Sequence, residues 1–365
     1  MNPPPTRENV ELASFTTLGV GGKARFFLDI ETEEMLERAL QWAGQGGIRV
    51  TVLGGGSNLL VSDRGFDGLV LRIRIRGIDE APTADGSDRV DLRVGAGEDL
   101  DALVDRAVRE GWAGLECLSG IPGYVGATPI QNVGAYGQEI SQTVVSVRVM
   151  DRSTTEVDDI AHASCRFSYR GSAFKEDLRG RHVVLSVRLS LARGGPATVR
   201  YPELARDIAA RGADASSLAE VRQSVLALRR SKSMVIDPDD PNRQSAGSFF
   251  TNPLVTKAAA SVVEDRARGA GADAMPRFAA GDKIKLSAAW LIEHAGFVKG
   301  TSDGPVGIST RHALAIVNRG GATAGQILDF AARVRDQVRS IFGVALEHEP
   351  VLLGFSEEET RILEG

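Results

Sequence analysis

Residues 120–137, GIPGYVGATPIQNVGAYG, place five glycines and two prolines within eighteen positions. Glycine destabilises the interior of a helix or strand, and proline removes a backbone N–H donor. The stretch is therefore unsuited to a long helix or a plain strand, and loops of more than about 12 residues in compact domains are often functional. We predict irregular backbone that wraps closely around a flat or charged ligand. A long loop with a purely structural role is the alternative.

A second glycine cluster, LGGGSNLLV at 53–61, follows a β-branched run. Consecutive backbone N–H groups in such a turn form a concave nest for anions, which favours a phosphate-bearing ligand. The spacing matches neither common nucleotide fingerprint, because Leu59 stands at the last glycine position of G-x-G-x-x-G and no Gly-Lys-Ser/Thr follows. A tight turn between two strands is the alternative.

Composition limits the class of protein. The 365 residues are enough for two or three domains, and 42% apolar with 25% charged residues is typical of a globular protein with a substantial core. The net charge of −5 argues against nucleic acid as a partner. No apolar run reaches the roughly 18 residues of a membrane span, and the first residues lack signal-peptide features, so we expect a cytoplasmic protein. Because no apolar surface stripe stands out, we expect a monomer.

Cysteine and histidine indicate neither a disulfide framework nor a metal site. Cys117 and Cys165 are expected to be small buried residues. The five histidines form neither H-E-x-x-H nor a Cys/His array, so we expect no metal. A serine hydrolase is not favoured either, because G-x-S-x-G does not occur.

Apolar periodicity predicts a mixture of helices and strands. Helical spacing occurs at 33–43, 99–111, 219–230, 285–296 and after the capping-box pair Thr323 and Gln326. Strand-like runs occur at 24–30, 48–53, 65–74, 90–97, 144–151, 165–170, 183–191, 312–318 and 344–355. Residues 80–89 indicate a linker or hairpin tip, 192–200 a bend, and 266–282 an irregular, mobile segment.

The stretch SAGSFFTNP, residues 245–253, follows a proline-rich loop and places Ser248 between Gly247 and two phenylalanines. This serine is compatible with a helix cap, a buried hydroxyl or a proton donor. The stretch alone does not decide between the three.

Seven blocks between Thr17 and Gly354 together resemble the UDP-N-acetylenolpyruvoylglucosamine reductase (MurB) family. In chain order they are TTLGVGGKA, LGGGSNLLVSD, GIPGYVGATPIQNVGAYG, CRFSYRGSAFK, GSFFTNP, WLIEHAGFVKG and LEHEPVLLG. Seven blocks in family order over nearly the whole chain are far more specific than any single block.

The resemblance implies the fold class. It is an α+β, three-domain FAD-binding flavoprotein of the vanillyl-alcohol-oxidase/PCMH type with a C-terminal substrate-binding domain. We expect FAD-binding domain 1 at 1–76, joined by the C-terminal segment 348–365, FAD-binding domain 2 at 77–218, and substrate-binding domain 3 at 219–347.

The resemblance also implies the cofactors FAD and NADPH. In the family, hydride passes from NADPH through FAD to carbon 3 of the enolpyruvyl group of UDP-N-acetylglucosamine-enolpyruvate. A proton added at carbon 2 then gives UDP-N-acetylmuramate, a peptidoglycan precursor. FAD should be non-covalent, because no histidine or cysteine signals a covalent link. The residues expected around FAD are Gly54, Gly55, Gly56, Ser57, Asn58, Leu59, Gly120, Ile121, Pro122, Gly123, Gly126, Ala127, Gln131, Asn132, Gly134, Ala135, Tyr136 and Gly137.

Three residues match the family's catalytic positions. Ser248 resembles the serine that donates the proton, Arg170 the arginine that stabilises the enolate, and Glu349 the acid that assists the carboxylate or the proton relay. An enolate-like intermediate needs fixed donors at its oxygens, and the planar fork of an arginine suits a carboxylate.

Five further residues match positions that bind the nucleotide-sugar substrate. Lys232 resembles a lysine that meets a phosphate of substrate or NADPH, and Asn252 an asparagine that contacts uridine and phosphate. Tyr201 resembles the tyrosine of a loop that closes on the diphosphate, which is a feature of the longer form of the family. Tyr169 is expected near flavin and sugar, and His312 near the uridine side.

Four positions depart from the family pattern. Gly171 stands where aspartate is common, Thr251 where lysine is common, and His312 where glutamine is often found. Tyr124 replaces a small residue, which puts the width of the flavin pocket in doubt. None of these departures removes a catalytic group.

Two other functions share part of this pattern. A flavin oxidase or dehydrogenase of the same fold would have the glycine clusters, but it would not need GSFFTNP or LEHEP. A flavin or nucleotide-sugar sensor without turnover would be favoured by loss of Ser248, Arg170 or Glu349, and all three are present.

Overall fold

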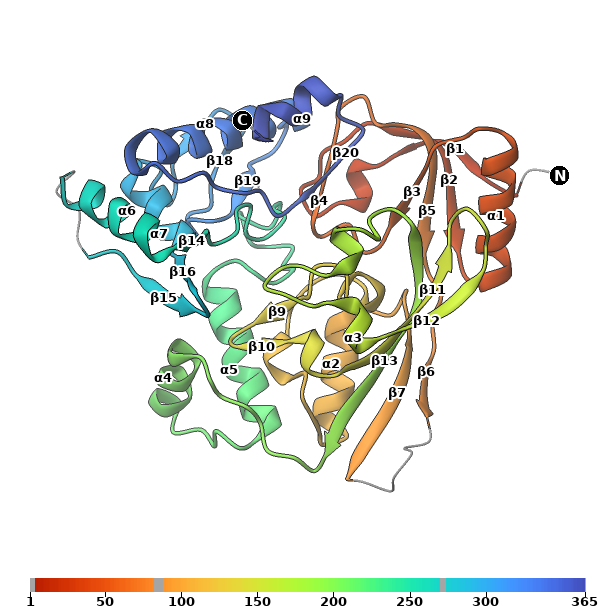
Figure 1. Cartoon of the computed structure of the whole chain (residues 1–365), viewed down its shortest axis with the longest axis horizontal. Helices are drawn as coiled ribbons and strands as arrows, with labels where there is room; N and C mark the ends of the chain where they lie inside the picture. The colour runs from red at the N-terminus through yellow and green to blue at the C-terminus, as the bar shows by residue number, and fades with distance from the viewer. Residues whose placement is uncertain (1–3, 82–87, 270–273, 365) are drawn as a thin grey trace. The chain divides into compact units, whose positions relative to one another are not determined.

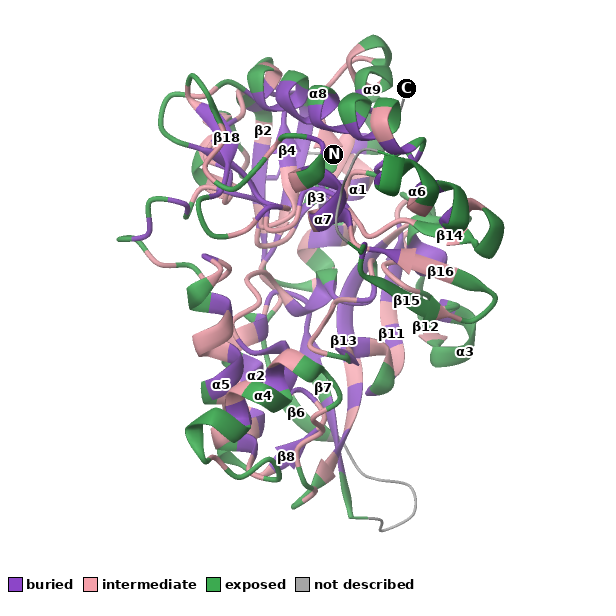
Figure 2. Cartoon of the chain, turned by 90° about the vertical axis from the view of Figure 1, so that its left-hand side faces the viewer, coloured by how far each residue is buried: buried purple, intermediate pink, exposed green. Residues whose placement is uncertain are grey.

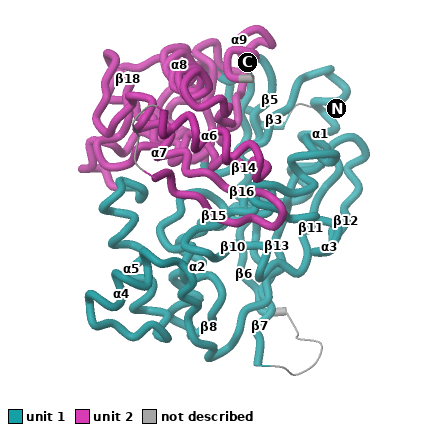
Figure 3. Tube along the Cα trace, turned by 60° about the vertical axis from the view of Figure 1, so that its left-hand side comes forward, with its two compact units in different colours: residues 1–10, 24–55, 67–236 teal, residues 11–23, 56–66, 237–365 magenta. Residues whose placement is uncertain are grey.

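The computed structural model of the chain describes residues 4–81, 88–269 and 274–364. The chain divides into two compact units (Figure 3). Unit 1 comprises residues 1–10, 24–55 and 67–236, and unit 2 comprises residues 11–23, 56–66 and 237–365. Within the described ranges, no helix combines the length and the apolar character that a membrane crossing requires.

Unit 1 is built mainly on two sheets (Figure 1). The first has the order β1-β2-β5-β3, formed by Arg7–Glu11, Lys23–Ile30, Phe66–Ile73 and Val50–Leu53. The second has the order β12-β11-β13-β7-β6, formed by Val157–Ala161, Val144–Asp151, His182–Arg193, Arg89–Gly95 and Ile78–Ala81, and β8 (Trp112–Ala113) also pairs with β13. The helices of this unit are α1 (Glu33–Gln45), α2 (Leu100–Arg109), α3 (His162–Cys165), α4 (Pro202–Arg211) and α5 (Leu218–Ser231).

The predicted helix at 33–43 is confirmed as α1, which begins with a local capping signal. The Thr32 hydroxyl accepts a hydrogen bond from the Met35 N–H at 3.2 Å, and Glu33 and Glu34 place negative charge in the first turn. Its apolar stripe of Leu36, Ala39, Leu40 and Ala43 is buried in the core of unit 1. Helix α2 repeats the pattern, with the Asp99 carboxylate capping Ala102 and a buried apolar face.

The predicted strand at 165–170 is wrong. Cys165 ends α3, and the chain then passes through Arg166 and Arg170, which have φ angles of 44° and 54°. A strand cannot continue through left-handed residues. Ser168 and Gly171 instead exchange backbone hydrogen bonds of 3.0 and 3.1 Å, which makes a tight turn. Both cysteines are buried free thiols, as expected.

Unit 2 contains small sheets and four helices among the residues that the structure describes. The antiparallel sheets are β14-β16-β15 (Leu254–Thr256, Lys283–Leu286, Arg277–Ala280) and β17-β18-β19 (Ser302–Asp303, Val306–Ile308, Ile316–Asn318), and β4 (Leu59–Val61) pairs in parallel with β20 (Val351–Leu353). The helices are α6 (Lys257–Gly269), α7 (Ala288–His294), α8 (Ala324–Phe342) and α9 (Glu357–Glu364).

The structure of helix α8 agrees with the features predicted from its sequence. Thr323 and Gln326 form the expected capping box, and Gly343, with φ 75°, ends the helix. The apolar spacing predicts an inward face of Ile327, Phe330, Ala331, Val334, Val338 and Ile341. All of these are buried except Ile341, which is partly buried. Figure 2 shows the buried stripe along α8. Nine residues of α8 belong to the buried core cluster of unit 2.

Three predictions for segments need correction. Residues 266–282 are not irregular throughout, because α6 extends to Gly269 and β15 spans Arg277–Ala280. The strands expected at 312–318 and 344–355 are confined to β19 and β20. Part of the expected hairpin tip at 80–89 and part of 266–282 lie outside the described residues.

Candidate active site

Gly54 and Gly55 of the first glycine cluster meet the second cluster within unit 1. Strand β3 ends at Leu53, and a side-chain Cβ built on Gly55 would lie 2.6 Å from the Cα of Gly123. One built on Gly54 would lie 3.8 Å from the Cβ of Ala127. Two backbones can approach this closely only where side chains are missing. The structure therefore joins two stretches that lie far apart in the sequence.

The second cluster has little regular structure, as predicted. It contains the 3-10 turn Val125–Ala127 and the short strand β9 (Gly134–Ala135), and strand β10 (Gln138–Glu139) follows it directly. Backbone hydrogen bonds from Val125 to Glu98 and from Gly126 to Ala96 attach it to the end of β7. Nearly all of its residues between 120 and 137 that are expected near FAD stay partly exposed. A partly exposed, glycine-rich backbone is a surface that a flat or phosphate-bearing ligand can cover closely.

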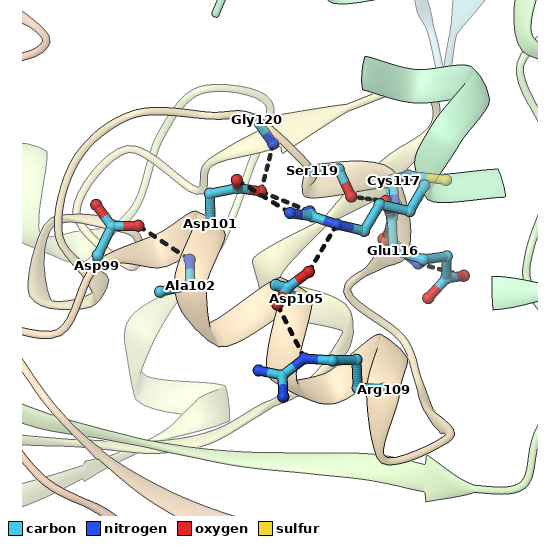
Figure 4. Close-up of polar contacts among 11 residues, drawn as sticks. Asp99, Asp101, Ala102, Asp105, Arg109, Glu116, Cys117, Ser119 and Gly120 are labelled. Carbon is cyan, nitrogen blue, oxygen red and sulfur yellow. Dashed lines mark hydrogen bonds and ion pairs between the residues drawn. The ribbon is translucent and has the colours of Figure 1, made fainter. Parts of the chain in front are cut away.

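A carboxylate that the sequence did not reveal holds the start of this cluster. Asp101 on α2 accepts the Gly120 N–H at 2.6 Å (Figure 4). It also pairs with Arg222 on α5 through both oxygens, at 2.6 and 3.1 Å. Burial opposes ionisation of Asp101, but the hydrogen bonds from Arg222 and Gly120 outweigh it and hold its pKa below the usual value. Gly120 itself has φ 74°, so the turn requires glycine.

Asp101→Asn is expected to lower the free energy of unfolding by about 1–3 kcal/mol at neutral pH, because it weakens a charge-assisted hydrogen-bond set. A lowered folded-state pKa stabilises the fold fully above the unfolded pKa of about 4, and this stability is lost as pH falls through the folded value. Urea unfolding at pH 7 and at progressively lower pH should therefore show the two proteins converging in acid. Asp105→Asn, which removes a more exposed carboxylate from α2, is the matched control. An equal loss in both variants would contradict the special role of Asp101.

Hairpin β9–β10 brings three of the expected ligand-binding residues together. Tyr136 and Gly137 form its turn with φ 49° and 81°, as the favoured two-residue hairpin turn requires. The Tyr136 ring meets Tyr201 edge to face at 5.6 Å, and burial raises the Tyr136 pKa to about 12. Tyr201 precedes α4, where Glu203 pairs with Lys232 at 2.6 Å. Tyr136 therefore contacts Tyr201, and Lys232 is paired with the first turn of the helix that follows Tyr201.

Arg170 points into the same part of unit 1. Its guanidinium donates to the carbonyl of Gly134 at 2.9 Å and lies 5.6 Å from the centre of the Tyr169 ring. The side chain of Asn132 supports this turn by donating to the Ser168 carbonyl at 3.0 Å and to Glu139 at 2.8 Å. The cluster and the 168–171 turn therefore fix the position of Arg170 together.

Ser248 belongs to unit 2, on a segment anchored by two buried rings. Phe249 and Phe250 are 0% and 1% exposed and meet at 5.3 Å. Gly247, with φ 73°, turns the chain just before the serine. The Ser248 hydroxyl is hydrogen-bonded to Nε2 of His312 at 3.3 Å. Ser248 caps no described helix, so the first of the three open roles is excluded.

Glu349 and Asn58 are brought to the segment that carries Ser248. The Glu349 N–H donates to the carbonyl of Phe249 at 2.9 Å, and Phe250 forms an isolated bridge with His348. The Asn58 side chain donates to the Glu349 carbonyl at 3.1 Å, and the Val351 N–H donates to Asn58 at 3.0 Å. The first glycine cluster, the serine segment and the C-terminal LEHEP segment thus meet in unit 2.

The remaining expected residues have local structural partners. The side-chain oxygen Oδ1 of Asn252 accepts the Ala288 N–H at 2.9 Å, at the start of α7. The hydroxyl of Tyr124, one of the departures, accepts a hydrogen bond from Arg74 at 2.9 Å. Within the described ranges, no group of His, Cys, Asp and Glu is arranged to hold a metal ion.

Two further buried groups escaped prediction. Glu116 is 1% exposed, and its carboxylate accepts hydrogen bonds from Gly114, Gln138 and Thr198. Arg229 is 7% exposed and lies beside Gly120, and burial lowers its pKa. The only sequence signal for either would be a charge at an otherwise inward-facing position.

Comparison with known proteins supports these observations. Residues 24–159 match a family model described as an FAD binding domain, and residues 239–353 match the C-terminal domain of UDP-N-acetylenolpyruvoylglucosamine reductase. The UDP-N-acetylenolpyruvoylglucosamine reductase of Thermobifida fusca is 48% identical over 350 residues, which are 95% of this chain and 97% of the relative. That of Saccharopolyspora erythraea is 50% identical over 349 residues, covering 94% of each chain.

A solved structure extends the comparison to the fold. The crystal structure of the same reductase (MurB) from Thermus caldophilus matches with a TM-score of 0.65 and 28% identity, covering 95% of this chain and 99% of that one. The α+β, FAD-binding fold class predicted from the resemblance is therefore confirmed. At these identities and coverages, the chain belongs to the UDP-N-acetylenolpyruvoylglucosamine reductase family of FAD-dependent oxidoreductases.

Proposed function

We propose that this protein reduces UDP-N-acetylglucosamine-enolpyruvate to UDP-N-acetylmuramate for peptidoglycan synthesis, with NADPH as reductant, FAD as cofactor and Ser248 as proton donor. The reductase activity, the FAD cofactor and the nucleotide-sugar substrate follow from family membership. The nicotinamide donor and the roles of individual residues rest on the matched motifs and on the geometry within each unit. The observation that carries most weight is the meeting of GSFFTNP, LEHEP and Asn58 in unit 2.

The glycine clusters fit FAD. Gly55 and Gly123 leave no room for a Cβ between their backbones, so main-chain groups rather than side chains line this part of unit 1. Main-chain N–H groups in turns suit a pyrophosphate, and close backbone suits a flat ring. We assign the FAD contacts to the two clusters, Gly54–Leu59 and Gly120–Gly137. When bound, FAD would carry a hydride from NADPH to carbon 3 of the enolpyruvyl group.

Three side chains would control the charge that develops on the substrate. Arg170 is held by Gly134 in a fixed orientation, so its guanidinium can donate to the substrate carboxylate without reorganisation. Glu349 would assist at that carboxylate or in proton transfer. Ser248, anchored by Phe249 and Phe250, would add the proton at carbon 2.

Five residues are proposed to bind the nucleotide sugar. Tyr201, Lys232 and Tyr169 would contact the diphosphate and sugar, and Asn252 and His312 would contact the uridine side. The Lys232–Glu203 pair supports this, because a phosphate can replace Glu203 as the lysine's partner. We also propose that the protein has the three domains with the boundaries given above and that it is a cytoplasmic monomer.

An anaerobic spectral experiment tests the proposal. The purified protein should show a flavin absorbance band, NADPH should bleach it, and UDP-N-acetylglucosamine-enolpyruvate should restore it. Bleaching without recovery would support a flavin oxidase or dehydrogenase for another substrate. A protein that never retains flavin would support a nucleotide-sugar sensor, and NADH bleaching as fast as NADPH would overturn the proposed donor.

A further inference from the structure

We infer that His312 hands a proton to Ser248 as the serine protonates the substrate, so that the proton donor of this enzyme is a serine–histidine pair. The inference rests on the proposed function, since it requires Ser248 to be the donor. It adds a role in proton transfer to the uridine-side contact proposed above for His312, at a position where glutamine is often found in the family. The main observation in its support is the 3.3 Å hydrogen bond between the Ser248 hydroxyl and Nε2 of His312.

The turn that carries His312 is rigidly held. The Ser309 hydroxyl, on a residue that is 0% exposed, accepts the N–H groups of Arg311 and His312 at 3.2 and 3.3 Å. The Asn242 side chain, itself 3% exposed, accepts the Thr310 N–H at 2.9 Å and donates to the Thr310 hydroxyl at 2.9 Å. These buried hydrogen bonds fix the backbone of the turn, so the position of the His312 side chain is pre-organised.

The serine is tied to the same turn. The Phe249 N–H donates to the carbonyl of Leu314 at 2.7 Å, and the Ala315 N–H donates to the carbonyl of His312 at 3.1 Å. The backbone segments of Ser248 and His312 are therefore hydrogen-bonded to each other. The bond joins Phe249, one residue after the serine, to Leu314, two residues after the histidine. Their hydrogen bond follows from this local structure of unit 2 rather than from a chance contact of two surface side chains.

The chemistry supplies the reason for such a pair. A serine hydroxyl that gives up its proton alone becomes an alkoxide, which is a costly species near neutral pH. Histidine is the side chain whose ordinary pKa lies closest to neutrality, so its protonated ring can supply a proton at that moment. Charged groups on the surrounding segments are Arg311, whose partner is Asp240 at 4.0 Å, and Glu349.

The transfer balances. One C–H bond forms at carbon 2 as the Ser248 O–H bond breaks, and a new Ser248 O–H bond forms as the Nε2–H bond of His312 breaks. The histidine regains the proton from water, and this is the one proton that the reduction consumes beside the hydride. In this step His312 acts through Ser248.

Rapid-mixing kinetics of the holoenzyme tests this relay, with the two half-reactions followed separately by flavin absorbance. His312→Ala and His312→Gln should leave reduction by NADPH unaffected and slow reoxidation at saturating substrate by about tenfold or more, the lower range of general acid catalysis. Glutamine keeps a hydrogen bond to Ser248 but carries no transferable proton. Imidazole in the buffer should speed the reoxidation of His312→Ala.

The double variant Ser248→Ala/His312→Ala separates the relay from a binding role. If His312 acts through Ser248, the double variant reoxidises no more slowly than Ser248→Ala alone, and imidazole does not help it. Multiplying effects, a weaker substrate affinity with an unchanged saturating rate, or a wild-type rate in His312→Gln would each overturn the relay. A wild-type rate in Ser248→Ala alone would instead overturn the proposed function.

Discussion

We expect Ser248→Ala to slow reoxidation of the flavin by UDP-N-acetylglucosamine-enolpyruvate by about 10²–10⁴-fold, the range of general acid catalysis, while NADPH still reduces the flavin. The hydroxyl is the group that we assign to protonation at carbon 2, and the first half-reaction needs no such proton. The serine segment is held by the buried Phe249 and Phe250 and by their backbone bonds, none of which the substitution removes. Anaerobic stopped-flow absorbance measures both half-reactions on one sample.

Thr251→Ala is the matched control, because it removes a hydroxyl three residues further along the same segment. The Thr251 hydroxyl makes only a long hydrogen bond of 3.5 Å, to the Glu347 carbonyl. A surface change of this kind alters free energies by about 0.5 kcal/mol or less, so reoxidation should stay within roughly twofold of the wild type. Equal slowing in both variants would mean that the segment, and not the Ser248 proton, controls the rate.

Local signals explain which elements could be predicted from the sequence. The capping pair Thr323 and Gln326, a long apolar stripe and the terminal Gly343 all act within α8, so its limits could be predicted. The run at 165–170 alternates like a strand, yet Arg166 and Arg170 adopt left-handed backbone that neither residue type favours. The bond from Arg170 to Gly134 and the packing around it select that conformation, and no local pattern records them.

The candidate site divides in the same way. Ser248, Arg170 and Glu349 could be named because short motifs around them resemble a family. The contacts of the site could not be predicted, because the residues that make them lie far apart in the sequence. Asn58 and Glu349 are 291 positions apart, Asp101 and Arg222 are 121 apart, and Ser248 and His312 are 64 apart. Such pairs are created only when the chain folds. The histidine at position 312 could be noted as a departure from the family pattern. Its hydrogen bond to Ser248, which suggests a role in proton transfer, is visible only in the folded chain.

Gly55→Ala is expected to weaken FAD binding by about 10²-fold or more, equivalent to roughly 2.7 kcal/mol. The new Cβ would lie 2.6 Å from the Cα of Gly123 and 3.2 Å from its carbonyl carbon, so two segments of main chain would have to separate. Unlike a side chain, backbone cannot rotate away, and insertions of this kind into tight packing cost about 1–3 kcal/mol. Flavin content after purification and titration of the apo-protein with FAD measure the loss.

Gly54→Ala is the matched control, because it adds the same methyl group at the neighbouring glycine. Its Cβ would meet only the Cβ of Ala127, at 3.8 Å, which is an ordinary contact, so the two clusters can stay together. We expect a clearly smaller loss of FAD affinity than in Gly55→Ala, and any loss that remains would report on how closely the cofactor approaches Gly54. If Gly55→Ala retained flavin as the wild type does, the close approach of the two clusters would not be what forms the FAD site. The assignment of FAD to residues 54–59 and 120–137 would then fail.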